Sequence, residues 1–278
     1  MINFFYLSII FLLSSVNLFA TSQYGDRLII EKDTIWINSN PLEFYFNQKG
    51  SRTINTANLS SGCTALWRGY IATWKLENNN LYLVRLQTDY CNTPKDIDLT
   101  KEFGSDKVFA KWYSETMIRP NGALLCYIHM GYNSIYEEDI YYKFKNGKLV
   151  KTDNKKYLEY DNKLMFPGET FLRNTIKNMI LKSIDTKTRE VLNEKQSCSI
   201  QVHFGKDRKI SKITVGYREK PKNELEKIIL EKSVDTLRNF PQLMKVTHEG
   251  YKPPTIILFF NAHCLKYPKD SVYGCKDE

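Results

Sequence analysis

The residues best suited to bind a ligand stand together in Trp67-Arg68-Gly69-Tyr70, at the head of a predicted β-hairpin. An arginine between two aromatic side chains can bind a carboxylate or a phosphate through two parallel hydrogen bonds. The alternative is structural: Gly69 allows a bend or bulge, and Arg68 pairs with Glu43 to fasten a preceding turn onto the sheet. The structural interpretation is favoured. Four residues stay as candidates for ligand binding, namely Trp67, Arg68, Tyr70 and Tyr132.

Other chemistry-bearing residues do not form a known catalytic pattern. The acidic trio Glu137-Glu138-Asp139 has strand spacing, which points neighbours to opposite faces, so a solvated turn is favoured over a paired-carboxylate hydrolase. Tyr141-Tyr142 could stack on a sugar ring, but one of the two must face inward. The sequence contains no GxSxG, HExxH, Walker or dinucleotide-binding motif. We therefore expect that the protein is not an enzyme and that it has no catalytic residue, no metal site and no cofactor.

The first twenty residues have the order of a secretory signal peptide. An apolar run, Phe4–Leu13, precedes polar-tinged residues, and Leu18-Phe19-Ala20 offers a small residue for cleavage before Thr21. The alternative is an uncleaved anchor, but a span needs about 20 apolar residues and this run is shorter. No later segment is apolar for long enough to cross a bilayer. We expect an exported protein, periplasmic or secreted, from a Gram-negative envelope.

The net charge of +9 comes from 40 basic and 31 acidic residues that are scattered along the chain. A basic surface could meet acidic lipid, nucleic acid or polyanionic sugar. Scattered charges are typical of a solvated surface, and export argues further against a nucleic-acid partner.

The chain contains six cysteines, at positions 63, 91, 126, 198, 264 and 275. No two of them have CxxC spacing, and disulfides in an oxidising compartment are the natural interpretation. If the hairpin turns at Asn78–Asn80, Cys91 lies opposite Trp67, four residues from Cys63. That separation is about 13 Å along an extended strand, whereas a disulfide needs Cα atoms within about 7 Å. A Cys63–Cys91 bond therefore requires the strand ends to bend. Cys126 is interpreted as a buried small hydrophobe.

The chain is predicted to be an α+β protein that divides near residue 165. Residues 21–165 contain alternating strands and turns, including an Asn146-Gly147 hairpin, and predict an antiparallel β-meander, either a curled sheet or a partial barrel. Asn40-Pro41-Leu42-Glu43 and Arg119-Pro120-Asn121-Gly122 are predicted turns.

Residues 166–278 predict the order α-β-β-α-β. A helix begins near Phe166, strands follow at Ser199–Phe204 and Ile210–Gly216, and Thr255–Asn261 forms the last strand. Asn223 and Glu226 form a predicted capping box before the second helix.

Residues of about 188–262 resemble the C-terminal domain of the TonB/TolA family of envelope proteins. The resemblance rests on Cys198–Phe204, Ile210–Val215, the Glu224–Asn239 helix with Phe240-Pro241, and Thr255–Phe260, in the family's order. The chain lacks the family's Pro-rich spacer, its Tyr-Pro before the first strand and its Trp-x-Pro after the helix, so the resemblance implies the fold and not energy coupling. It implies that the first and last strands are antiparallel neighbours, and hence a Cys198–Cys264 disulfide, with Cys275 as a competing partner.

The front part is similar to a group of uncharacterised exported bacterial proteins, through Asn40–Glu43, Trp67–Tyr70, Asn121-Gly122 and Met130-Gly131-Tyr132. Two functions stay open. The first is a non-enzymatic envelope protein that contacts another envelope protein, with strand addition at a sheet edge as one mode. The alternative is a binder of acidic glycan or another anionic ligand on an aromatic-basic face of the front sheet.

Overall fold

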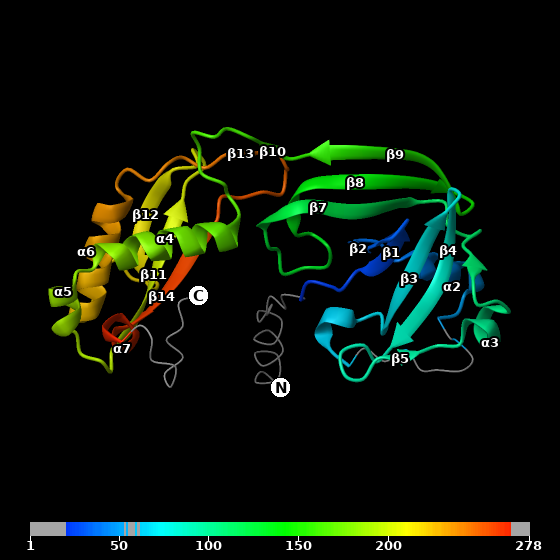
Figure 1. Cartoon of the computed structure of the whole chain (residues 1–278), viewed down its shortest axis with the longest axis horizontal. Helices are drawn as coiled ribbons and strands as arrows, with labels where there is room; N and C mark the ends of the chain where they lie inside the picture. Colours follow the sequence, from blue (N-terminus) through cyan, green and yellow to red (C-terminus); the bar gives the residue numbers. More distant parts are fainter. Residues whose placement is uncertain (1–20, 53, 55–58, 60–61, 268–278) are drawn as a thin grey trace, which may run out of the picture. The chain divides into compact units, whose positions relative to one another are not determined.

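The structure, a computed structural model, describes residues 21–52, 54, 59 and 62–267, so the predicted signal peptide lies outside the described residues. The fold is α+β and built mostly from sheet, as predicted (Figure 1). The chain forms two compact units. Unit 1 runs to Ile118 and adds Ile128–Ser134 and Tyr142–Lys151, and unit 2 contains the rest. The predicted boundary at residue 165 therefore differs from the structure, because the long strands β7 to β9 contribute residues to both units.

The first sheet has the strand order β2-β1-β3-β4-β9-β8-β7, with β5 and β6 also paired to β4. Its strands are β1 (Asp26–Ile30), β2 (Asp33–Ile37), β3 (Tyr70–Glu77), β4 (Asn80–Thr88), β5 (Lys95–Asp96), β6 (Val108–Phe109), β7 (Thr116–Cys126), β8 (Ile135–Lys145) and β9 (Lys148–Lys156). The predicted meander is interrupted at one place, because β1 and β3 are parallel neighbours. The sheet curls so that Asn38, just after β2, donates its backbone N–H to the carbonyl of Ile118 in β7.

The two predicted hairpin turns are confirmed, with a shift of register in the first. Asn78 and Asn79 both have positive φ, as do Asn146 and Gly147, which is the backbone of a type I′ turn. A turn at Asn78–Asn80 that sets Cys91 opposite Trp67 would also pair Trp74 with Val84, but Trp74 pairs with Leu83. A bulge between Thr73 and Trp74 restores the expected register in the other half of the hairpin, where Thr73 pairs with Arg85.

Two predicted turns are wrong. Pro41 begins helix α2 (Pro41–Lys49), which ends at Gly50 in the left-handed conformation. Proline is well tolerated at a first helical position because the missing N–H has no partner there. The second predicted turn, Arg119–Gly122, lies inside β7, and within this strand Gly122 has the positive φ of 78° that glycine tolerates. The other short helices of this part are η1 (Thr64–Leu66) and α3 (Leu99–Phe103).

Unit 2 confirms the predicted α-β-β-α-β order, with short elements added. The elements are β10 (Leu158–Glu159), α4 (Glu169–Ser183), α5 (Thr186–Glu190), β11 (Ser197–Phe204), β12 (Ile210–Val215), α6 (Glu224–Leu237), β13 (Lys245–Val246), β14 (Thr255–Asn261) and α7 (Ala262–Lys266). The sheet order is β12-β11-β14, and the last strand is antiparallel to the first, as expected.

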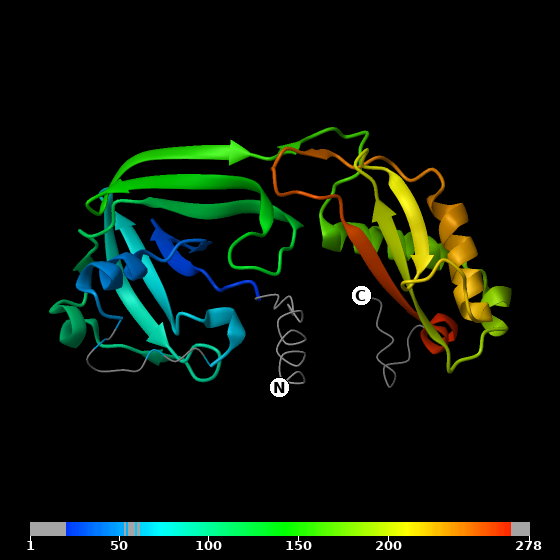
Figure 2. The same cartoon turned by 180° about the vertical axis from the view of Figure 1, so that it is seen from behind.

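Helices α4 and α6 cover one face of this sheet, and the strands lie in front of them in the view from behind (Figures 1 and 2). The core between helices and sheet includes Ile176, Ile229, Ile200, Val202 and Leu258, all of which are essentially inaccessible to solvent. In the part of the chain that the structure describes, no helix combines the length and the apolar character needed to cross a membrane.

Candidate functional site

Arg68 lies inside unit 1 and is paired with Asp26. The Arg68 Nη2 atom is 3.0 Å from Asp26 Oδ1, and neither side chain is exposed to solvent. Asp26 begins β1, and Arg68 stands just before β3, so the parallel pairing of these two strands brings the charges together. The charged group that the sequence offers for a ligand is therefore neutralised inside the protein.

The carboxylate of Asp26 has three donors around it. Besides Arg68, the backbone N–H of Ala72 donates to Oδ1 at 3.1 Å, and the indole N–H of Trp74 donates to Oδ2 at 2.9 Å. Burial raises the pKa of the Asp26 carboxyl, and Arg68 together with these N–H donors opposes the rise. Burial is the largest single influence and lowers the pKa of Arg68, but the charge and hydrogen bond of Asp26, together with Tyr132 and Tyr70, more than offset it, so the pKa is raised. This buried ion pair has a structural role, because removal of either charged side chain would leave the other charge unpaired inside the protein.

A second layer of hydrogen bonds surrounds the ion pair. Arg68 Nη1 donates to the hydroxyl of Tyr132 at 2.9 Å, and this hydroxyl donates to Asn40 Oδ1 at 2.8 Å. Arg68 also donates to the backbone carbonyl of Tyr24. The guanidinium therefore links the segment of Tyr24 and Asp26 to Tyr132, whose hydroxyl extends the network to Asn40.

The predicted partner of Arg68, Glu43, is instead bound to other residues. Its Oε1 atom accepts from the hydroxyl of Tyr70 and from Arg52, each at 2.9 Å. Glu43 stands in the first turn of α2 rather than in a free turn, and the helix directs it to Tyr70. The structural interpretation of Arg68 fits the fold, but the predicted partner is wrong and Asp26 takes its place.

The four candidate ligand-binding residues do not form one open site. Arg68 and Tyr70 are buried, Tyr132 is half-buried, and Trp67 is 60% exposed. A ligand does not reach Arg68 or Tyr70 in this structure, so the hypothesis of direct contact by these two is corrected. The sequence reasoning missed Asp26, although its alternation with Leu28 and Ile30 placed it on the buried face of β1.

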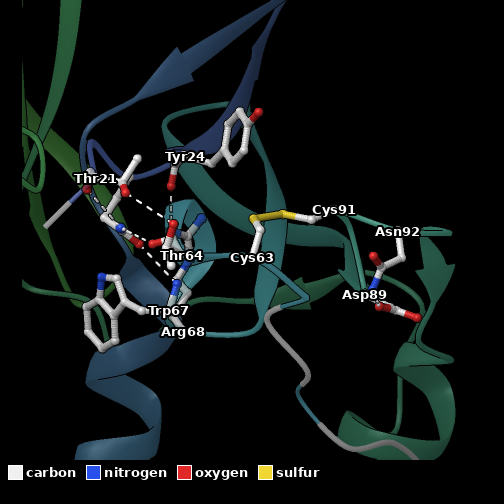
Figure 3. Close-up of a disulfide and its surroundings, with 10 residues drawn as sticks. Thr21, Tyr24, Cys63, Thr64, Trp67, Arg68, Asp89, Cys91 and Asn92 are labelled. Carbon is white, nitrogen blue, oxygen red and sulfur yellow. Dashed lines mark hydrogen bonds between the residues drawn. A yellow bond between two sulfur atoms is a disulfide. The ribbon is translucent and has the colours of Figure 1, made fainter. Parts of the chain in front are cut away.

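A disulfide joins Cys63 and Cys91, with Cα atoms 5.9 Å apart (Figure 3). The distance estimate from extended strands fails because the strands stop earlier: β4 ends at Thr88, and Cys63 precedes the short helix η1. Asp89 has φ of 54° and accepts a backbone hydrogen bond from Asn92, so the chain turns there. The strand ends bend, as the sequence argument required for this bond.

The predicted Cys198–Cys264 disulfide is wrong. Cys198 is a free thiol, and Cys264 is disulfide-bonded to another residue. The strands pair as expected, but the register places Cys198 opposite Phe260, and the chain enters α7 at Ala262 before it reaches Cys264. The competing partner, Cys275, lies outside the described residues.

The Cys198 thiol is expected to resist alkylation in the native protein. Burial, with a smaller effect of Glu226, raises its pKa to about 12, so little thiolate is present at pH 8. Iodoacetamide at pH 8 without reductant should leave Cys198 unmodified in the folded protein and should modify it in urea, as read by mass spectrometry. Modification only after addition of a reductant would instead mean that Cys198 is disulfide-bonded.

The acidic trio lies in strand β8 of unit 2, not in the solvated turn that was predicted. Glu137 accepts a hydrogen bond from the hydroxyl of Tyr160 at 2.6 Å, and Asp139 accepts one from Tyr157 at 3.0 Å. The pKa of Glu138 is lowered by hydrogen bonds from Asn154 and Asn121. A general acid needs a raised carboxyl pKa, so this group does not resemble a pair of hydrolase carboxylates.

One side of β14 is left without a strand partner in the described part of unit 2. Among the described residues, β14 pairs with β11 alone. Phe259 points to the face away from the helices and is 72% exposed. A cavity of about 500 Å³ lies at the end of β11 and β14, lined by Ser197, Cys198, Ser199, Glu226, Phe259, Phe260 and Asn261.

Comparison with family models, with curated proteins and with solved structures finds no match to this chain.

Proposed function

We propose that the protein is an exported, non-enzymatic envelope protein whose unit 2 binds another protein by strand addition at the free edge of β14. In this mode an extended peptide pairs with a sheet edge through its backbone, and nearby pockets select alternate side chains. The α-β-β-α-β order and the antiparallel pairing of β11 with β14 are what the resemblance to TonB/TolA implies, and both support the proposal.

The edge of β14, along which the described residues place no further strand, is the observation that carries the proposal. Natural sheets guard their edge strands with charges, prolines or bulges because an open edge pairs with other chains. The other edge strand, β12, contains Lys212, whereas β14 has the sequence TIILFFN, with no charge and no proline. Phe259 and the adjacent cavity would then receive side chains of the added strand. Export is supported by the Cys63–Cys91 disulfide, which fits an oxidising compartment.

The proposal is tested by photo-crosslinking from Phe259 in envelope extract, followed by binding of a peptide from the captured protein. On peptide binding, the backbone amides of β14 should become more protected from hydrogen exchange. Phe259→Lys should abolish both effects, because it places a charge on the docking face. Tyr217→Lys is the matched control, since Tyr217 is an exposed aromatic of the same unit, 96% accessible, and lies outside β14. Unchanged β14 amides, or equal losses in the two variants, would rule out strand addition here.

The alternative function, binding of an acidic glycan, requires a cation with no internal acidic partner. Arg68 does not meet this requirement, because Asp26 already neutralises it.

A further inference from the structure

Four side chains form a half-exposed cluster on the outer face of β1 and β2, and we call it the Arg27 platform: Tyr24, Arg27, Trp36 and Tyr90. The Cζ atom of Arg27 lies 4.9 Å from the centre of the Trp36 ring and 5.4 Å from that of Tyr90. Tyr24 joins both rings, with its centroid 6.3 Å from Trp36 and 5.8 Å from Tyr90. All four belong to unit 1.

Two rings of the platform are open to solvent side by side. Tyr24 is 44% exposed and Trp36 is 43% exposed, and their planes differ by 35°. Aromatic side chains usually bury most of their surface, because removing their large apolar area from water is favourable. Two adjacent exposed rings therefore offer an apolar aromatic surface beside a cation.

Arg27 has no acidic partner within ion-pair distance among the described residues. The hydrogen bond that its guanidinium donates goes to the hydroxyl oxygen of Tyr90, at 2.6 Å. Two other arginines of unit 1 do have an acidic partner. Arg68 is paired with Asp26, and Arg52, which also contacts an aromatic ring (Trp67), is paired with Glu43. The Arg27 guanidinium is therefore positioned by the Trp36 and Tyr90 rings, while its positive charge stays available to an external anion.

The platform is held in place by the buried features described above. Alternation along β1 turns Asp26 inward and Arg27 outward. The backbone carbonyl of Tyr24 accepts a hydrogen bond from Arg68 (Figure 3). Tyr90 directly precedes Cys91 in the sequence, and Cys91 is disulfide-bonded. A surface whose side chains are already positioned loses little conformational entropy when it binds.

We propose that the Arg27 platform binds a sugar ring that bears a carboxylate. Arg27 takes the carboxylate through two parallel hydrogen bonds, and the Tyr24 and Trp36 rings cover the apolar C–H face of the pyranose. An acidic peptide offers the same carboxylate on a flexible side chain, without a rigid flat face to cover two adjacent rings. This site belongs to unit 1 and is independent of the strand addition proposed for unit 2.

The test is a calorimetric titration of the full mature chain with tetragalacturonate at low salt. Arg27→Gln should weaken binding by at least about tenfold, the loss expected for one charge-assisted contact. Trp36→Ala should weaken it by a similar factor, because it removes a ring that covers the apolar face of the sugar. Arg27→Lys keeps the charge without the planar fork and should fall between wild type and Arg27→Gln. Arg52→Gln is the matched control, because Arg52 also contacts an aromatic ring in unit 1, and its effect should stay within about twofold. Tryptophan fluorescence in urea checks that each variant is folded.

Several outcomes would overturn the proposal. The first is that the wild-type protein does not bind tetragalacturonate. The second is an equal loss of affinity in Arg27→Gln and Arg52→Gln, which would mean that the sugar is attracted by the overall charge and not by one site. Tetraglutamate binding as tightly as the sugar would assign the platform to acidic peptides. Binding of uncharged maltotetraose with similar affinity would remove the role of Arg27.

Discussion

Replacing Arg68 with methionine is expected to lower the free energy of unfolding of unit 1 by about 3–5 kcal/mol, which is the cost of breaking a buried ion pair on one side. The substitution leaves the Asp26 carboxylate without its cation inside the fold, with only the N–H donors of Ala72 and Trp74. Urea unfolding followed by tryptophan fluorescence measures this directly. The four tryptophans of the chain, residues 36, 67, 74 and 112, all lie in unit 1, so the signal reports this unit alone.

A double-mutant cycle identifies the partner of Arg68. The double variant Asp26→Leu/Arg68→Met should lose less free energy of unfolding than the two single variants lose together, by at least about 2 kcal/mol. The reason is that the double variant contains no unpaired buried charge. Glu43→Ala combined with Arg68→Met should be additive to within about 1 kcal/mol, since Glu43 binds Tyr70 and Arg52 instead. Additive losses for Asp26 with strong coupling to Glu43 would show that the pairing derived from the sequence was correct after all.

Removing the Cys63–Cys91 disulfide has the second largest expected effect. The bond closes a loop of 29 residues (91 − 63 + 1), and its loss should lower the stability of unit 1 by about 3–4 kcal/mol through the greater entropy of the unfolded chain. The double variant Cys63→Ala/Cys91→Ala should show this loss in tryptophan-detected unfolding. Tetragalacturonate affinity should fall as well, because Tyr90 is next to Cys91 and loses its anchor.

The control for the disulfide is Cys126→Ala, which removes a free cysteine of unit 2. The tryptophan signal of unit 1 should not change in this variant. A loss below about 1 kcal/mol in the disulfide variant would mean that other contacts hold the ends of β3 and β4 together.

Local signals allowed much of the fold to be predicted. Consecutive residues with positive φ at Asn78-Asn79 and Asn146-Gly147 fixed two hairpins, since few residue types tolerate that backbone. Asn223 accepts the backbone N–H of Glu226 and caps α6, as the sequence indicated. The carboxylate of Glu226 departs from the predicted box, because it accepts from Lys222 rather than from Asn223.

Contacts between distant segments were harder to predict. The pairing of Asp26 with Arg68 depends on β1 lying parallel to β3, and nothing local in either strand specifies that neighbour. The same holds for the Arg27 platform, whose residues come from three separate segments. Cys198 and Cys264 show the limit of topology alone, because the strands met as expected while one added helix carried the second cysteine away.

The central claim is that Arg68 holds unit 1 together while Arg27 is available to a ligand. The side-chain Nε–H resonances of the arginines, observed by NMR during titration with tetragalacturonate, test both halves at once. We expect the Arg27 resonance to shift with the ligand, the Arg52 resonance to stay in place, and the Arg68 resonance to remain unchanged and to exchange slowly with water. A ligand-dependent shift at Arg68, or rapid exchange there with no response at Arg27, would contradict it.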